Sequence, residues 1–289
     1  MGWRTVVISK SSKIEYKLGY VVIRDSEGTI RVHASEISVL IFENTASAVT
    51  TALLNELIKL KVKVIFCDEK RNPSSELVPY YGSHDCSMKI RTQMQWSGFS
   101  KQNVWTSLVT QKIKMQAENL VFFGLPESQL LYGYIEEIEF NDESNREGHA
   151  AKVYFNAMFG KAFSRSDDNP INAMLDYGYS IILSCINREI ACCGYLTQIG
   201  LFHDNMFNQF NLSCDLMEPF RAIVDRLTRQ LMPTQFELNE KRQILQLLNE
   251  EFLIDGKRQT LINTIKIYTR SVLEAIESND ASIIKYFEL

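Results

Sequence analysis

The chain contains few of the residues that interrupt regular secondary structure. Only 13 glycines and 6 prolines occur among 289 residues, which is about 7% against roughly 12% in average proteins. Because both residue types destabilise helix interiors, their scarcity favours long helices over much of the length. Long apolar runs are also missing, since none exceeds four residues. No segment is therefore expected to span a bilayer.

The N-terminus lacks the marks of a targeting signal. The opening MGWRTVVISK has no apolar stretch of signal-peptide length and no small-residue cleavage site. It begins like a myristoylation motif, but it has no Ser or Thr at the required position. We therefore expect a cytoplasmic protein that contacts no membrane.

The six cysteines form no C-x-x-C pair and show no spacing typical of a zinc site. In a reducing cytosol we expect them to be small buried apolar groups. An excess of positive charge is lacking as well, since the formal net charge is −4. This counts against nucleic-acid binding by the whole surface but leaves room for a local basic face. Residues 85–116 in fact carry five Lys or Arg and one acid, whereas residues 125–147 carry seven acids and one Arg.

The first 80 residues show the period-two alternation of half-buried strands. Residues 60–66 alternate apolar and polar side chains, and four further short runs are rich in β-branched residues. These runs are Thr5–Ser9, Tyr20–Arg24, Thr29–Val32 and Val39–Phe42. Between the fourth run and residue 60, apolar side chains recur three to four positions apart, which predicts one helix. We predict a small β-rich domain over residues 1–80 with a single helix.

After about residue 85 the apolar pattern takes the period of a helix. Apolar side chains recur every three to four positions in Val109–Leu120 and again in Leu261–Val272. Residues 167–170 (Asp-Asp-Asn-Pro) predict a loop leading into a helix from Ile171, and Asp255-Gly-Lys predicts a turn between two late helices. We therefore predict an α+β fold. A linker, residues 81–100, joins the β-rich domain to a larger, all-α C-terminal domain, residues 101–289.

Few side chains are available for acid–base or metal chemistry. The chain has 4 histidines: His33, His84, His149 and His203. The first two are expected to be structural or exposed, whereas the other two lie near acids in the sequence. Asp215 and Glu218 are three positions apart, so a helix would point both carboxylates the same way. Such a pair could share a divalent cation. Alternatively, the two acids could lie in the first turn of a helix, where the helix dipole favours negative charge and Ser213 is the N-cap. The local pattern leaves both interpretations open.

Five stretches, in order along the chain, resemble one family. They are residues 104–116 (VWTSLVTQKIKMQ), 146–155 (REGHAAKVYF), 169–179 (NPINAMLDYGY), 194–203 (GYLTQIGLFH) and 212–221 (LSCDLMEPFR). Through them the chain resembles, along essentially its whole length, the CRISPR-associated integrase of spacer acquisition. This is the universal CRISPR-associated endonuclease family of the adaptation module. The opening MGWRTVVIS and the segment Met217–Arg221 look most like its type II branch.

The resemblance implies a metal site in the C-terminal domain. Matched residue by residue, the family's metal ligands and catalytic residues fall on Glu147, His203 and Glu218. Asp215 matches a further acidic position, either a second ligand candidate or a hydrogen-bonding support. Many relatives have Asp at the position of Glu218. Glutamate has one methylene more than aspartate, and this moves the carboxylate outward. One imidazole with two or three carboxylates suits Mg²⁺ or Mn²⁺, because these hard cations prefer oxygen ligands.

The reaction implied by the resemblance is phosphodiester exchange. The 3′-hydroxyls of a short foreign DNA fragment, the protospacer, would attack the repeat at its boundary in a CRISPR array. A Lewis-acidic cation stabilises the charge that develops on the phosphate and on the leaving oxygen. The protein itself would supply no covalent nucleophile.

Basic residues close to these motifs are candidates for holding DNA phosphates. They are Lys89, Arg91, Lys101, Lys112, Lys114, Arg146 and Arg221. The resemblance also implies a homodimer formed largely through the β-rich domains and a complex with a small ferredoxin-like CRISPR-associated protein. In the type II branch, a ring-forming adaptation protein and the RNA-guided effector nuclease are further expected partners. Acidic residues 136–143 should face away from DNA unless they meet a partner protein.

Two other functions remain as alternatives. A non-catalytic DNA-binding scaffold subunit would keep the fold, but the presence of Glu147, His203 and Glu218 together argues against it. A structure-selective nuclease of DNA repair would use the same residues on a different substrate. The sequence does not separate the integrase from this nuclease.

Overall fold

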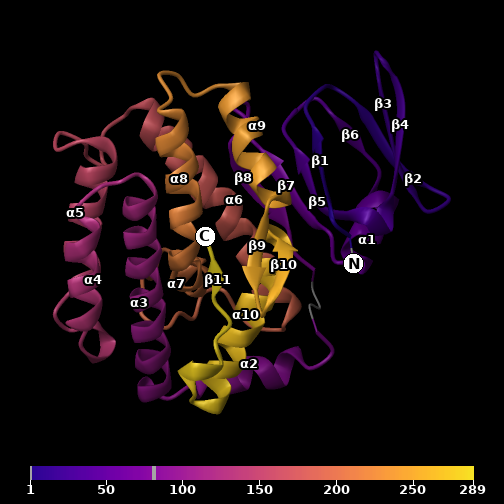
Figure 1. The fold of residues 1–289 in the computed structure, drawn as a ribbon. Coiled ribbons are helices and arrows are strands. Elements are labelled where there is room, and N and C mark those ends of the chain that lie inside the picture. The colour runs from indigo at the N-terminus through magenta and orange to yellow at the C-terminus, as the bar shows by residue number, and fades with distance from the viewer. Residues whose placement is uncertain (1, 80–82) are drawn as a thin grey trace.

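The computed structural model describes residues 2–79 and 83–289. A β-rich N-terminal part is followed by a mainly helical C-terminal part (Figure 1), which confirms the predicted fold class. The strands of the N-terminal part are β1 Arg4–Ile8, β2 Lys13–Lys17, β3 Tyr20–Asp25, β4 Gly28–His33, β5 Ile37–Phe42, β6 Ala48–Val49, β7 Lys63–Cys67 and β8 Pro73–Leu77. The helix α1, Thr51–Lys59, precedes β7 and begins where the Thr50 side chain accepts a hydrogen bond from the Leu53 N–H.

These strands form two four-stranded sheets, with the orders β1-β5-β7-β8 and β4-β3-β2-β6. In the first sheet β1, β5 and β7 run parallel, and β8 closes the edge antiparallel to β7. In the second sheet β2, β3 and β4 form an antiparallel meander, and β6 adds to β2 in parallel. Side chains from both sheets and from α1 share one apolar core.

The first sheet also forms the wall against the helical part. All six residues of β5 are buried, as expected for a strand covered on both faces. Leu40 and Phe42 point into the core of the N-terminal part. Val39 and Ile41, which alternate with them, belong to the main core of the helical part. One continuous apolar strand thus joins the two parts of the chain.

The helical part contains α2 Cys86–Met94, α3 Gly98–Phe122, α4 Ser128–Glu136, α5 Arg146–Phe159, α6 Pro170–Cys192, α7 Asn211–Met217, α8 Arg221–Leu231, α9 Leu238–Gln246 and α10 Leu261–Ser278. Short 3₁₀ turns lie at Ala34–Glu36, Phe140–Asp142, Glu218–Phe220, Leu247–Asn249 and Ala281–Ile283. In Figure 1, α4 and α5 lie on the outer side of α3, away from the β-rich part. Helices α3, α5 and α7 carry or flank the residues of the candidate site.

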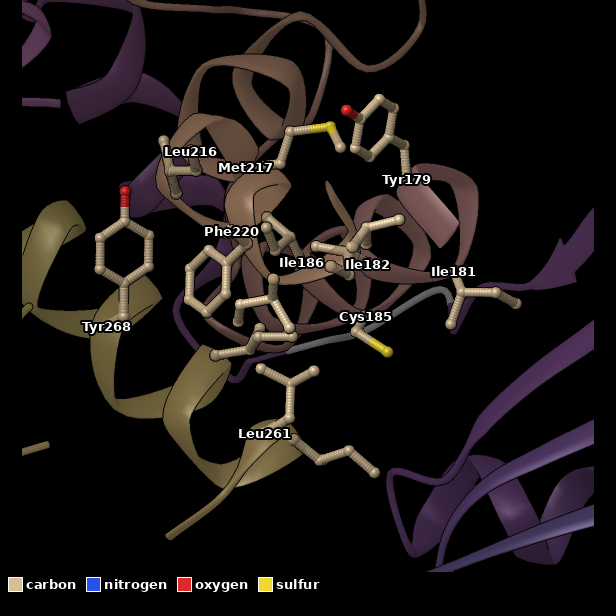
Figure 2. Close-up of a cluster of buried hydrophobic side chains, with 14 of the residues drawn as sticks. Tyr179, Ile181, Ile182, Cys185, Ile186, Leu216, Met217, Phe220, Leu261 and Tyr268 are labelled. Atoms are coloured by element: carbon tan, nitrogen blue, oxygen red, sulfur yellow. The ribbon is translucent and has the colours of Figure 1, made fainter. Parts of the chain in front are cut away.

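The predicted apolar stripes are buried as expected. The stripe of α3 is solvent-inaccessible at Val109, Ile113, Ala117 and Leu120, and that of α10 is inaccessible at Leu261, Ile265, Tyr268 and Val272. Figure 2 shows Phe220 between Tyr268 of α10 and the isoleucines of α6. The two rings meet edge to face with their centroids 5.0 Å apart. This packing fixes the segment immediately after Glu218.

The C-terminal part differs in one respect from the all-α domain that the sequence predicts. Strands β9 Glu251–Ile254, β10 Lys257–Thr260 and β11 Phe287–Glu288 form a three-stranded sheet of order β10-β9-β11. The Asp255-Gly-Lys turn joins β9 to β10, so its interpretation as a turn between two helices was wrong. Phe252 and Ile254 are buried while Leu253 is exposed. Four residues of alternation are too short to stand out from the surrounding helical pattern.

The predicted boundary at residues 80 and 81 lies outside the described residues. Within the predicted linker, α2 and the first residues of α3 are helical, and the domain limits stay a prediction. Among the described helices, none combines the length and the apolar composition needed to cross a bilayer.

A buried acid on α8 makes a testable contribution to stability. Asp225 is 1% exposed and accepts a hydrogen bond from the Tyr179 hydroxyl. Burial raises the pKa of Asp225 to about 6. Because the native state disfavours the charged form, this contribution to stability is present below about pH 4 and is lost as the pH rises through about 6.

We therefore expect Asp225→Asn to become more stable relative to the wild type as the pH rises. Between pH 4 and pH 7.5 the difference in unfolding free energy should move in favour of the variant by about 3 kcal/mol, the equivalent of a shift of about two pKa units. Urea unfolding at the two pH values measures this difference. An equal difference at both would contradict a raised pKa of Asp225 in the native state.

Candidate active site

Glu147 lies in the first turn of α5, where local hydrogen bonds fix the start of the helix. The Asn145 side chain accepts a hydrogen bond from the Gly148 N–H at 3.3 Å. The Asp142 carboxylate accepts from the N–H groups of Arg146 at 2.7 Å and Glu147 at 3.0 Å. These acceptors satisfy N–H groups that have no partner within the helix. The Glu147 side chain then reaches α3, where it meets Lys112.

Asp215 organises the loop that carries His203. This carboxylate on α7 is fully buried and accepts hydrogen bonds from the N–H groups of Leu201 at 2.6 Å, Phe202 at 3.3 Å and His203 at 3.1 Å. The loop can approach so closely because residue 200 is glycine. A Cβ at Gly200 would lie 2.8 Å from the Asp215 Oδ2 and 2.4 Å from the His203 carbonyl oxygen. Asp215 therefore supports the backbone of the site.

The same carboxylate orients the imidazole of His203. Asp215 Oδ1 lies 2.6 Å from His203 Nδ1, and an ionised carboxylate can only accept. Nδ1 therefore carries the proton, and Nε2 is the ring nitrogen left for a cation or a phosphate. The Trp105 indole and the imidazole meet edge to face with their centroids 5.9 Å apart, and Phe202 stacks on the same indole at 4.5 Å.

The carboxylates around His203 favour its charged form. The hydrogen bond to Asp215 raises the pKa of His203, burial opposes the rise, and the charges of Asp215, Glu218 and Glu147 add to it. Glu147, from α5, and Glu218, from the segment after α7, share the Lys112 ammonium. Asp215 lies behind the histidine.

Two positively charged side chains contact the Glu218 carboxylate. Lys112 Nζ lies 2.5 Å from Glu147 Oε1 and 2.5 Å from Glu218 Oε2, so one ammonium bridges both carboxylates. Arg221 Nε lies 3.1 and 3.0 Å from the two oxygens of Glu218. Burial alone would raise the pKa of Glu218, but Arg221 and Lys112 outweigh it and lower the pKa to about 2. Glu218 is therefore ionised at any physiological pH.

This arrangement differs from the local interpretation of Asp215 and Glu218 as acids in a first helical turn capped by Ser213. Helix α7 ends at Met217, and Glu218 opens the following 3₁₀ turn. Phe210, rather than Ser213, occupies the N-cap of α7, and the buried Ser213 hydroxyl has no hydrogen-bond partner. The two carboxylates play different parts, since Asp215 bonds the loop and His203 while Glu218 bonds two cations.

The predicted DNA-binding residues fall into two groups. Lys112 and Arg221 lie within the site, and Arg146 directly precedes Glu147 while pairing with Glu137 at 2.9 Å. The others lie on α2 or α3 outside the site. They are Lys89, which pairs with Glu277 at 3.0 Å, Lys114, which lies 3.9 Å from Glu118, and Arg91 and Lys101.

The remaining histidines, His33, His84 and His149, are exposed. His149 is exposed and faces Tyr134 with ring centroids 6.4 Å apart. His33 is exposed on β4, where its Nδ1 lies 2.7 Å from the Ser35 hydroxyl.

The donor types suit a hard divalent cation. Two carboxylates and an imidazole held by a buried carboxylate form the set that Mg²⁺ and Mn²⁺ accept, and a carboxylate behind a ligating histidine is common in such sites. Within the described residues, however, no three His, Cys, Asp or Glu side chains are placed to hold a metal ion. The cation shared by Glu147 and Glu218 is the Lys112 ammonium. The donor atoms are therefore of the types that Mg²⁺ and Mn²⁺ bind. A metal bound by both carboxylates would have to share them with the Lys112 ammonium or displace it.

The fold and this acidic–basic cluster define a two-part α+β protein with a polar site in its helical part. Comparison with known proteins gives the family. Residues 5–265 match the family model described as "CRISPR associated protein Cas1". The chain belongs to the Cas1 family.

Individual relatives extend over the full chain. The CRISPR-associated endonuclease Cas1 of Neisseria meningitidis serogroup C (strain 8013) is 28% identical over 300 residues, which cover 100% of this chain and 97% of that protein. The fold is similar to that of a Cas1 protein from Thermotoga maritima, with a TM-score of 0.76 at 15% identity over 94% of this chain and 97% of that one.

Two further solved structures share the fold. A casposase bound to its integration product has a TM-score of 0.70 at 18% identity, over 96% of this chain and 91% of that chain. A chain of a Cas6-RT-Cas1–Cas2 complex has a TM-score of 0.71 at 14% identity, over 97% of this chain and 36% of that chain. At these identities the likeness concerns the fold alone.

Proposed function

We propose that this protein is a metal-dependent DNA integrase that inserts short foreign DNA fragments into a CRISPR array. The observation that carries the proposal is that Glu147 and Glu218, from separate segments, share the Lys112 ammonium, together with a His203 imidazole that the buried Asp215 orients. Membership in the Cas1 family supports it. Branch membership in type II is part of the proposal and rests on the N-terminal and Met217–Arg221 segments.

In this proposal Glu147, His203 and Glu218 hold Mg²⁺ or Mn²⁺. The cation, when bound, supplies Lewis-acid stabilisation of the charge on the reacting phosphodiester. Asp215 keeps the Nδ1 proton of His203 in place, so that Nε2 faces the site unprotonated. Lys112 and Arg221 offset the charge of the carboxylates. The attacking group is the 3′-hydroxyl of the incoming DNA.

We further propose DNA, a second copy of this chain and a small ferredoxin-like CRISPR-associated protein as partners. The ring-forming adaptation protein and the RNA-guided effector nuclease belong to the same proposal for a type II system. The similar folds found in a Cas6-RT-Cas1–Cas2 complex and in a casposase bound to its integration product support DNA and a CRISPR-associated protein as partners.

A joining assay separates the proposed function from its alternatives. The protein and its small partner are incubated with a short duplex bearing 3′-hydroxyls and a repeat-containing plasmid. Covalent joining of the duplex to the plasmid supports the integrase. Nicking without joining identifies a nuclease, and binding without either reaction identifies a scaffold subunit.

Lys112 makes a specific prediction about metal affinity. Because its ammonium bonds both proposed ligands, replacing it with a neutral side chain removes a competing positive charge. A neighbouring charge of this kind shifts carboxylate pKa values by about 1–3 units, and we expect an effect of similar size on a divalent cation. Lys112→Met should therefore bind Mn²⁺ about tenfold more tightly than the wild type in the absence of DNA.

The loss of the free Mn²⁺ signal in electron paramagnetic resonance titrations measures this affinity. Lys114→Met is the matched control, because Lys114 lies on the same helix but is exposed and faces Glu118. Weaker Mn²⁺ binding by Lys112→Met would show that the ammonium organises the carboxylates instead of competing for them.

A further inference from the structure

The segment that carries His203 has no regular secondary structure of its own. Residues 193–210, which connect α6 to α7 and which we call the His203 loop, form neither helix nor strand. In the first half of this loop, the Gln93 side chain of α2 accepts a hydrogen bond from the Leu196 N–H and donates one to the Leu196 carbonyl oxygen, both at 2.8 Å. In the second half, the Asp215 carboxylate accepts from three N–H groups. The position of His203 therefore depends on contacts with other elements.

Trp105 of α3 is a further contact of the His203 loop. Its indole stacks on the Phe202 ring, with 2° between the planes and 4.5 Å between the centroids. The same indole meets the His203 imidazole at 88°, with the centroids 5.9 Å apart. Aromatic rings prefer offset stacks and edge-to-face pairs at such separations. One tryptophan thus contacts both the histidine and the residue before it.

The indole is itself held firmly. Trp105 is 1% exposed and belongs to an apolar core that α3, α4 and α5 share, in which Tyr154 is also fully buried. Because protein cores are close-packed, a buried ring has little room to turn. The same core holds α5, whose first turn contains Glu147. Trp105 therefore ties the His203 loop to the packed helices of the candidate site.

The hydrogen bond to Asp215 does not by itself fix the imidazole of His203. It determines which ring nitrogen carries the proton, but the second side-chain torsion of histidine has a broad energy well. The ring can therefore turn about the hydrogen bond without breaking it. An indole at a right angle to the imidazole restricts this rotation, and the stack on Phe202 keeps the preceding residue against α3. The direction of Nε2 thus depends on Trp105 as well as on Asp215.

We propose that Trp105 is a positioning residue for His203, which acts through its contacts with the imidazole and with Phe202. It fixes the plane of the ring and so the direction in which Nε2 points. The inference rests on the proposed function, in which Nε2 faces the cation at the reacting phosphodiester. A misplacement of about 1 Å in an active site can cost about 100-fold in rate. A tryptophan outside the predicted ligand set is then needed for the full rate of joining.

Two variants remove the contact from its two sides. Trp105→Leu removes the indole, and Phe202→Leu removes the ring on which it stacks. Each should lower kcat for strand joining about 10- to 100-fold, the usual cost of losing a group that orients a metal ligand. KM for DNA should not change, because the affinity for DNA comes from phosphate contacts. Trp105→Phe keeps an aromatic face against Phe202 and should restore most of the rate.

Trp96→Leu is the matched control. The Trp96 ring also meets an aromatic residue of the His203 loop, Tyr195, with 5.6 Å between centroids, but Tyr195 lies at the start of the loop. The kcat of this variant should equal that of the wild type, and thermal melting checks every variant. Phe202 is 50% exposed, so Phe202→Leu should fold even if the loss of the buried indole unfolds Trp105→Leu.

A second measurement is independent of joining. The ring current of an indole displaces the proton resonances of an adjacent imidazole, and NMR spectra of metal-free protein labelled at its 4 histidines record this displacement. The resonances of His203 are identified by their absence in His203→Gln. In both variants of the contact they should move toward those of the exposed histidines, and in the control they should stay in place.

The proposal is overturned if Trp105→Leu and Phe202→Leu fold and keep the wild-type kcat, if their loss is confined to KM, or if the control loses as much. Resonances of His203 that stay in place in both variants would overturn it as well. If the wild type joins no DNA, the proposed function fails, and the resonances alone decide whether Trp105 positions the imidazole.

Discussion

Glu218→Gln should reduce strand joining at least about 100-fold while leaving the fold intact. Removing even a group that supports a metal ligand costs about 10- to 100-fold in affinity or activity, and Glu218 is a proposed ligand. Its carboxylate is buried and bonds both Lys112 and Arg221. The neutral amide keeps the shape of the side chain but removes the negative charge that a divalent cation requires.

Joining rates, circular dichroism and thermal melting measured together separate a catalytic loss from an unfolded variant. Glu274→Gln, at an exposed position of α10, is the control for the loss of one acid. A normal joining rate in Glu218→Gln would show that Glu218 is not a ligand. Asp215 would then become the candidate.

Asp215→Asn should lower the joining rate about 10- to 100-fold through the position of His203. An amide can donate to the histidine as well as accept, so it no longer fixes the proton on Nδ1. Asp215→Ala should go further and destabilise the protein by about 3 kcal/mol or more, because three backbone N–H groups lose a buried charged acceptor.

Melting curves and joining rates for both variants test this. The two roles of Asp215 predict that Asp215→Asn loses more activity than stability, whereas Asp215→Ala loses both. A wild-type rate in Asp215→Asn would mean that the tautomer of His203 has no part in the reaction.

The sequence predicts those elements whose pattern is long or strongly periodic. The stripes of α3 and α10 and the buried strands β5 and β7 follow directly from apolar spacing. Strand β2 was missed although Lys13–Lys17 alternates polar and apolar side chains, which is the pattern of a half-buried strand. Strand β8 begins with Pro-Ser-Ser, which is typical of a loop. In β8, pairing with β7 overrides this weak local preference.

The candidate site depended on more than the local pattern. The spacing of Asp215 and Glu218 was compatible with two interpretations, a metal site or a pair of acids at a helix terminus. The prediction of Glu147, His203 and Glu218 as ligands came from the family resemblance. Their placement in the fold depends on the packing of α3, α5 and α7, which no local pattern contains. The position of Lys112 did carry a signal. It lies between Val109 and Ile113 of the buried stripe, which places its ammonium inside the protein and in need of acid partners.

The central claim is that a divalent cation at the Glu147, His203 and Glu218 site serves strand joining and not the fold. The most direct measurement follows joining over time while a chelator is added and Mn²⁺ or Mg²⁺ is then restored, with thermal melting and DNA binding recorded on the same samples. The affinity for DNA should come from many phosphate contacts, whereas the cation should act only on the phosphodiester that reacts. We predict that chelation stops joining, that metal restores it, and that the melting temperature and most of the DNA affinity stay unchanged. Joining that continues without metal, or loss of the fold on chelation, would contradict the account.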